Sequence, residues 1–267
     1  MRTVDGTTQL RGTRMSWAIE GEGPLVVYGH GLTNDRRTME DAGIFDFGPV
    51  VDAGFRLLRL DWRGHGASGG GDDPAEYTWS ALADDLLALL DELQPDAPVA
   101  AIGCSMGTGS VLTAAVRRPD RFSRLVLTAP PTAWETRAAQ ADFYRSAAQI
   151  VAEGGAAAWE RAQAMAEPVG IFAELDAPLP MRAREELLPA ILRGAAEADL
   201  PPRDAVRALR VPTLILSWAG DPGHPVSTGE QLHELIAGSR FEVADSLAGT
   251  RAWGTTIAGF LTGGGRG

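Results

Sequence analysis

The chain is poor in cysteine: Cys104 is the only one among its 267 residues. A single thiol excludes an internal disulfide and the paired cysteine ligands of a structural zinc site. The segment MRTVDGTTQL has no apolar signal-peptide core, and no stretch approaches the roughly 18 apolar residues of a membrane span. We therefore expect a cytoplasmic protein with no bound metal, no secretory signal and no membrane contact, whose residues 263–267 form a flexible tail.

Basic residues are also few, with 24 Lys and Arg against 35 Asp and Glu and a net charge of −11. Nucleic-acid binding needs clustered basic side chains, and the sequence contains only short pairs such as Arg36-Arg37 and Arg117-Arg118. The sequence also lacks a dinucleotide-binding fingerprint and a P-loop. We therefore expect no nucleic-acid partner and no cofactor.

What the sequence does contain is an alternation of short apolar runs with amphipathic helical patterns. Strands are predicted at 24–31, 55–66, 98–107, 122–131, 211–218 and 240–246, and helices at 77–93, 108–120, 228–238 and 251–262. Strands separated by helices predict an α/β fold with a mainly parallel sheet covered on both faces. Between 132 and 206 the alternation fails, and this Ala-rich stretch is predicted to be a helical insertion.

The segment AIGCSMG contains the pattern G-x-S-x-G, with Ser105 between Gly103 and Gly107. The pattern suits a sharp turn from a strand into a helix, because the glycines remove Cβ atoms that would clash and the central serine is exposed at the apex. The following helix also directs backbone N–H groups toward the serine. Since a predicted strand precedes the motif and a predicted helix follows it, Ser105 is a candidate nucleophile.

Four blocks together resemble the α/β-hydrolase family over nearly the whole chain. They are YGHGLTND, DWRGHGAS, GCSMG and VPTLILSWAGDPGHP. The resemblance implies an eight-stranded, mostly parallel sheet with helices on both faces and a helical cap inserted after strand 6. On this basis residues 1–131 and 207–262 would form the core and residues 132–206 the cap.

The resemblance also assigns roles to residues. It implies that Ser105 is the nucleophile, that the backbone N–H groups of Leu32 and Met106 form the oxyanion hole, and that Asp221 is the acidic member of the triad. The family's histidine normally follows the last strand, where this chain reads VADSLAGTRAW without any histidine. The general base that takes the proton of Ser105 must therefore come from another segment of the chain.

The chain has four histidines, at positions 30, 65, 224 and 233. His30 matches a scaffold residue of the family's oxyanion loop, His65 is expected to brace a glycine-rich turn, and His233 is expected at the solvent edge of a helix. His224 remains, three residues after Asp221 in a loop stiffened by two prolines. We predict that His224 is the general base.

Two acids are candidates for orienting His224. Asp221 is the first choice, and Asp245, at the end of the last predicted strand, is the second. Cys104 is expected to be a buried structural thiol, and Asp61 to hold its own loop through Arg63 or backbone amides.

The sequence therefore predicts a serine hydrolase that acts on a small hydrophobic carboxylic ester or lactone. Aromatic residues and methionines of the insertion are expected partly to form its own core and partly to line an apolar pocket over Ser105. Two alternatives stay open: a non-hydrolytic, C–C bond-cleaving or cyclising tailoring enzyme of natural-product metabolism, and a non-catalytic small-molecule receptor. The sequence also leaves a homodimer open.

Overall fold

The computed structural model describes residues 3–263 and is built on one eight-stranded sheet with the order β1-β2-β4-β3-β5-β6-β7-β8. The strands are β1 (Val4–Leu10), β2 (Thr13–Glu20), β3 (Leu25–Gly29), β4 (Arg56–Leu60), β5 (Val99–Cys104), β6 (Phe122–Thr128), β7 (Thr213–Trp218) and β8 (Arg240–Ala244). Strands β3 to β8 pair in parallel, whereas β2 is antiparallel to both of its neighbours. The predicted α/β class and mostly parallel sheet are confirmed.

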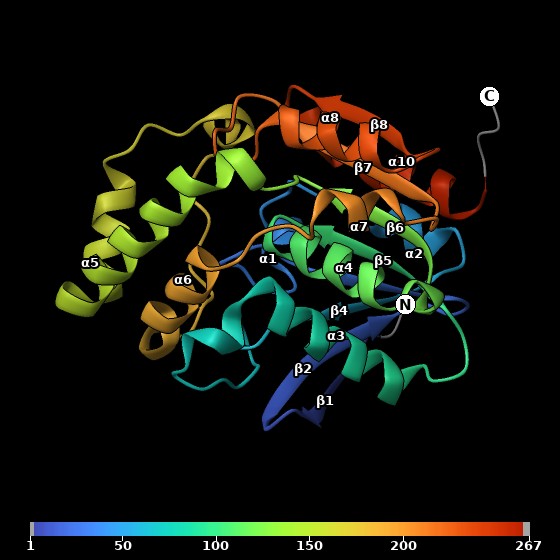
Figure 1. Cartoon of the computed structure of the whole chain (residues 1–267), viewed down its shortest axis with the longest axis horizontal. Coiled ribbons are helices and arrows are strands. Elements are labelled where there is room, and N and C mark those ends of the chain that lie inside the picture. Colours follow the sequence, from blue (N-terminus) through green and yellow to red (C-terminus); the bar gives the residue numbers. More distant parts are fainter. Residues whose placement is uncertain (1–2, 264–267) are drawn as a thin grey trace.

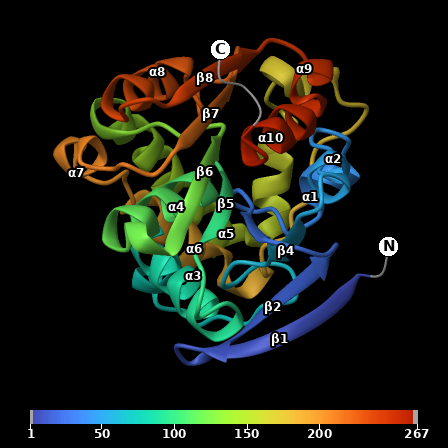
Figure 2. The ribbon, with the colours of Figure 1, turned by 90° about the vertical axis from the view of Figure 1, so that its right-hand side faces the viewer.

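Helices cover both faces of this sheet (Figures 1 and 2). One face carries α3 (Trp79–Leu93), α4 (Met106–Arg117) and α8 (Val226–Leu235); the other carries α1 (Thr38–Asp41), α2 (Gly48–Asp52), α9 (Leu247–Arg251) and α10 (Trp253–Leu261). Successive residues of a strand point to opposite faces, so Leu58 joins the apolar cluster under α3 and α4 while Leu57 joins the one under α2 and α10. Burial on both faces explains why the central strands are continuous apolar runs.

The hairpin of β1 and β2 is the part of the sheet that no apolar run predicted. In β1 exposed and half-buried residues alternate without a single buried position. The hairpin lies at the edge of the sheet, so β1 has no buried position and its composition stays polar, whereas β2, one strand further in, is partly buried.

The connection from β6 to β7 is helical, as expected. It contains α5 (Arg137–Ala164), α6 (Leu188–Ala196) and α7 (Arg203–Arg207), with short 3-10 helices at η3 (Trp134–Thr136), η4 (Gly170–Glu174) and η5 (Glu185–Leu187). The long helix α5 is kinked at Gly155, whose φ is 72°. Helices α5 and α6 pack on each other beside the sheet, whereas α7 packs on α4 and α8 (Figure 1). The limits of the cap at 132 and 206 stay a prediction.

Arg137 joins this helical segment to the core. Its buried guanidinium donates to the carbonyls of Ala195 and Ala198, at the end of α6, and lies 4.4 Å from the ring centre of Trp79 in α3. The carbonyls at a helix end carry partial negative charge, so they can stabilise this buried cation without a carboxylate. The start of α5, the end of α6 and the start of α3 are thus held together.

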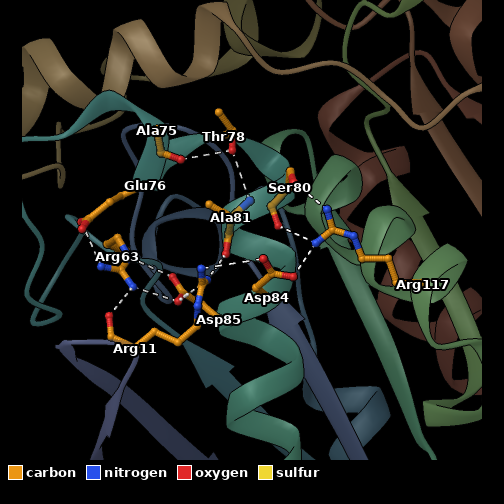
Figure 3. Close-up of polar contacts among 10 residues, drawn as sticks. All are labelled: Arg11, Arg63, Ala75, Glu76, Thr78, Ser80, Ala81, Asp84, Asp85 and Arg117. Carbon is orange, nitrogen blue, oxygen red and sulfur yellow. Dashed lines mark hydrogen bonds and ion pairs between the residues drawn. The ribbon is translucent and has the colours of Figure 1, made fainter.

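A buried ion pair holds the loop that follows β4 (Figure 3). Two nitrogens of Arg63 donate to the two carboxylate oxygens of Asp85 in α3, each at 2.9 Å, and Arg63 also donates to Glu76. Arg11, in the β1–β2 turn, donates to Asp85 at 3.0 Å. Three segments far apart in the sequence therefore meet at one carboxylate.

Residues 264–267 of the predicted tail 263–267 lie outside the described residues, and Gly263 is two residues beyond Leu261, the last residue of α10. Across residues 3–263, no helix has both the length and the apolar character required to cross a membrane.

Candidate active site

Ser105 lies at the sharp turn between β5 and α4. Its backbone is in an unusual region, with φ of 53° and ψ of −112°. A Cβ atom on Gly103 would lie 2.4 Å from the carbonyl oxygen of Gly107, and one on Gly107 would lie 2.0 Å from the carbonyl oxygen of Gly29. Both distances are far below contact distance, so the two glycines of the motif are required for the turn.

His224 comes from the loop between β7 and α8, and its ring lies between Ser105 and Asp221. Its Nε2 is 2.7 Å from Ser105 Oγ, and its Nδ1 is 2.7 Å from Asp221 Oδ2. An ionised carboxylate can only accept, so Nδ1 carries the proton and Nε2 accepts from the serine hydroxyl. The three residues that the sequence singled out therefore form one chain of hydrogen bonds.

Asp221 is held by more than His224. Its carboxylate also accepts from the indole Nε1 of Trp218 at 3.0 Å and from the amide of Gly223 at 2.8 Å. Burial by itself would raise the pKa of Asp221, but the hydrogen bonds and positive charge that His224 can supply, together with these two donors, outweigh it and lower the pKa. The carboxylate is therefore ionised at neutral pH.

The loop around His224 is stiffened by its packing. The His224 amide donates to the Asp221 carbonyl at 3.1 Å and closes a turn between the two residues. Trp218 contacts the His224 ring edge-on at 5.3 Å between ring centres, and it stacks on Trp253 behind it. The contribution of Trp218 was not predicted, because nothing in the sequence distinguishes it from any other strand-end residue.

The two predicted oxyanion amides flank the serine. Met106 is the first residue of α4, and Leu32 lies in the loop after β3. Within the described part of the chain, neither amide donates to a protein acceptor. A Cβ atom on Gly31 would lie only 3.4 Å from Ser105 Cβ, which places the Leu32 loop against the serine. Within residues 3–263, neither amide is thus paired with another backbone group.

The other predicted candidates do not join this chain of hydrogen bonds. His30 and His65 are fully buried and bond to backbone groups of neighbouring loops. His233 is exposed and contacts Ser239 and Phe241, and Asp245 is exposed at the end of β8. Asp221, and not Asp245, is therefore the acid beside His224.

Two further expectations concern residues near the serine. Burial raises the pKa of Cys104 to about 12, so this thiol is protonated and unreactive at neutral pH, as expected of a structural cysteine. Asp61 does hold its loop through backbone amides, those of Arg36 and Ala67. Arg63, which the sequence suggested as another partner of Asp61, pairs with Asp85 instead.

Of the insertion's aromatic residues and methionines, some form its own core and others are exposed. Trp159 is buried in a cluster with α6, whereas Met165 is 88% exposed. Tyr144 and Met181, like Leu32 of the loop after β3, are partly buried and pack against the same cluster. Among residues 3–263 no group of three or more His, Cys, Asp or Glu side chains could hold a metal ion.

Comparisons with known proteins agree with this fold. A family model described as alpha/beta hydrolase fold matches residues 24–249. Over 206 residues the chain is 30% identical to "Putative carbamate hydrolase RutD" of Klebsiella pneumoniae, and the aligned region covers 72% of this chain and 73% of that protein. A match to an epoxide hydrolase of Caballeronia sordidicola is 33% identical over 103 residues but covers 39% of this chain and only 30% of that protein.

Two solved structures resemble the chain over almost its whole length. A thermophilic esterase from Thermogutta terrifontis, with malate bound, has a TM-score of 0.74 and 25% identity and covers 98% of this chain and 99% of its own. The enol-lactonase from Burkholderia xenovorans LB400 has a TM-score of 0.68 and 26% identity and covers 96% of this chain and 100% of its own. The likeness therefore extends over the helical segment as well as the sheet.

Proposed function

Because the chain belongs to the alpha/beta hydrolase fold family, we propose that it is a serine hydrolase that cleaves carboxylic esters or lactones through an acyl-enzyme on Ser105. The observation that carries the proposal is the pair of 2.7 Å contacts that His224 makes, one to Ser105 Oγ and one to Asp221. A serine becomes a useful nucleophile only when an oriented base takes its proton. We propose that His224, held by these two contacts, is that base.

The reaction begins when Ser105 Oγ attacks the substrate carbonyl carbon and His224 Nε2 takes the hydroxyl proton. The amides of Leu32 and Met106 donate to the oxygen that becomes negative, and Asp221 stabilises the imidazolium. The intermediate then collapses, and Nε2 gives the proton to the departing alcohol oxygen. Water, deprotonated by Nε2, attacks the acyl carbon. The bond between that carbon and Ser105 Oγ then breaks, Nε2 returns its proton to Oγ, and the acid leaves.

The substrate is proposed to be a small, uncharged, fairly hydrophobic ester or lactone. Leu32, Tyr144 and Met181 share one apolar cluster at the junction of the oxyanion loop and the helical segment, which favours an apolar group there. The full-length likeness to an esterase and to an enol-lactonase supports ester and lactone bonds as the target. We propose no cofactor, because the steps above use only side chains and backbone amides of this chain.

The proposal is tested by comparing the wild type with Ser105→Ala, His224→Ala and Asp221→Asn on short p-nitrophenyl esters. We expect His224→Ala to lower kcat by about 10³-fold or more, and Asp221→Asn by about 10³–10⁴-fold, because an amide in place of the acid favours the wrong imidazole tautomer. A fluorophosphonate probe should label the wild type and not Ser105→Ala. His233→Ala, which changes an exposed histidine of α8, is the matched control and should retain wild-type turnover.

Three results would contradict the proposal in different ways. Unchanged turnover in His224→Ala would remove His224 from the mechanism. A wild type that the phosphonate does not label would favour a receptor. Labelling of Ser105 without any ester or lactone turnover would favour a non-hydrolytic enzyme of this fold.

A further inference from the structure

Thr33, which follows Leu32, has a backbone that its residue type disfavours. Its φ is 63°, in the left-handed region that β-branched side chains rarely occupy. Such a conformation is strained and persists only where neighbouring groups impose it. Because Leu32 carries a proposed oxyanion amide, the groups that impose the turn at Thr33 also decide where that amide points.

Both backbone polar groups of Thr33 are held by other segments. Its N–H donates to Nε2 of His65 at 3.3 Å, and its carbonyl accepts from the Arg182 amide at 2.6 Å. Its own hydroxyl donates to the Leu32 carbonyl at 2.7 Å. Thr33 is therefore hydrogen-bonded on one side to the loop after β4 and on the other to the helical segment.

The His65 ring is set to accept this hydrogen bond. Its Nδ1 lies 2.8 Å from the Arg63 carbonyl, which can only accept, so Nδ1 carries the proton and Nε2 keeps its lone pair. The ring is fully buried, so water cannot replace it. Burial first, and then the charge that His30 can carry, lower the pKa of His65 to about 3 despite the opposing carboxylates of Asp61 and Asp35.

Residues 182–184, in the helical segment between β6 and β7, contact both Thr33 and the loop that carries His65. The Gly66 amide donates to the Arg182 carbonyl at 2.9 Å, and the Arg184 amide donates to the Gly64 carbonyl at 2.8 Å. His65 and Ala183 form an isolated antiparallel bridge between these contacts. Displacement of the helical segment would therefore release the Thr33 carbonyl and the His65 loop together.

We propose that His65 is a positioning residue: with residues 182–184 it holds the left-handed turn at Thr33 and so aims the Leu32 amide at the oxyanion. It does not touch the reacting atoms. The inference rests on the proposed function, because it needs the Leu32 amide to act in the reaction. Its consequence is that the helical segment is coupled to the oxyanion hole through Thr33.

The test measures kcat and KM for a short p-nitrophenyl ester in the wild type, His65→Leu and His65→Gln. The leucine has no acceptor, whereas the glutamine can place its carbonyl oxygen near the position of Nε2. We expect His65→Leu to lower kcat by about 10–100-fold with KM changed by less than about threefold, since a misplaced oxyanion donor affects mainly the transition state. His65→Gln should stay within about threefold of the wild-type kcat.

The matched control is Leu89→Ala, which removes a fully buried side chain in α3. It should lower the melting temperature and leave kcat unchanged, so a loss of kcat in His65→Leu cannot be attributed to lowered stability alone. Wild-type kcat in His65→Leu, or equal losses in the leucine and glutamine variants, would overturn the inference while leaving the proposed function intact. A wild type without Ser105-dependent turnover would overturn both.

A spectroscopic measurement keeps the inference testable if His65→Leu does not fold. A long-range proton–nitrogen NMR spectrum of the wild type should show His65 protonated at Nδ1 and bare at Nε2. The opposite tautomer could not accept from Thr33 and would overturn the inference.

Discussion

His30 and His65 lie 5.2 Å apart between ring centres, and neither ring is exposed. Each accepts a backbone N–H through Nε2, His30 from Trp62 at 3.0 Å and His65 from Thr33 at 3.3 Å. Burial is the main cause that lowers the pKa of His30 to about 4 and that of His65 to about 3. Both rings are therefore neutral in the folded protein under conditions in which an unfolded histidine is protonated.

The lower pKa of these two histidines in the folded chain than in the unfolded chain predicts how stability depends on pH. Between about pH 6.5 and about pH 4 the unfolded chain binds protons that the folded chain does not, so the free energy of unfolding should fall as the pH falls. Each buried histidine contributes a slope of about 1.4 kcal/mol per pH unit in this window. Urea unfolding of the wild type and of His65→Gln between pH 6.5 and 4.5 measures the slope of the free energy of unfolding against pH. The variant should have the shallower slope, and equal slopes would contradict the prediction.

The contact between Asp221 and His224 is another feature of single residues. The two are three positions apart in one loop, a spacing that leaves little room for a carboxylate to reach an imidazole. The turn closed by the His224 amide on the Asp221 carbonyl brings Nδ1 and Oδ2 to 2.7 Å. The residue types predicted the pair, but the partner indole of Trp218 follows only from the packing against Trp253.

At the scale of elements, the turn from β5 into α4 depends on two glycines. Its geometry follows from the motif alone, because a Cβ on either glycine would overlap a backbone carbonyl that cannot move aside. The sequence therefore predicts this turn better than any other part of the site.

The glycine requirement predicts opposite effects of the same substitution at two positions. Gly107→Ala should lower the free energy of unfolding by about 3 kcal/mol or more and reduce phosphonate labelling of Ser105, because its Cβ would lie 2.0 Å from the Gly29 carbonyl oxygen. Gly259→Ala in α10 meets no atom within 4 Å and should stabilise the protein by about 0.5–1 kcal/mol. Urea unfolding measures both; a Gly107→Ala variant as stable as the wild type would refute the first part.

Other elements were predicted less well, for physical reasons. The β1–β2 hairpin is polar because it lies at the sheet edge, so periodicity does not reveal it. The insertion was predicted to be helical, but its composition could not show that α5 is kinked at Gly155 or that α7 returns to the core. Those features depend on which neighbours each helix meets.

For the molecule as a whole, the Arg63–Asp85 pair connects the site to the scaffold. The Asp85 side chain has no exposed surface, and it meets Arg63 from the loop that carries His65 and Arg11 from the hairpin. Removing one partner of a buried pair leaves an uncompensated charge, whereas replacing both with apolar residues does not.

Asp85→Ala is therefore expected to lower the free energy of unfolding by about 3–5 kcal/mol. The double variant Arg63→Met/Asp85→Leu should be more stable than Asp85→Ala, because both buried charges are removed and the partners that lose a contact, Arg11 and Glu76, are partly exposed to water. Asp142→Ala, which removes an exposed partner of the exposed Arg145, should cost less than about 1 kcal/mol. The measurement is urea unfolding at pH 7, and a double variant no more stable than Asp85→Ala would refute this account.

The sequence by itself determined the α/β class, the sheet with its helical insertion and the serine turn, because periodicity and motif spacing are local properties. The resemblance to the family added Asp221 as the first of two candidate acids, and His224 was the histidine that remained as a candidate base. Only the tertiary structure decided that His224 reaches Ser105, 119 positions away, and that Asp221 rather than Asp245 lies beside it. The same holds for the contact of Arg182 with Thr33. Such contacts depend on how separate loops converge at one end of the sheet, and no local pattern encodes that distance.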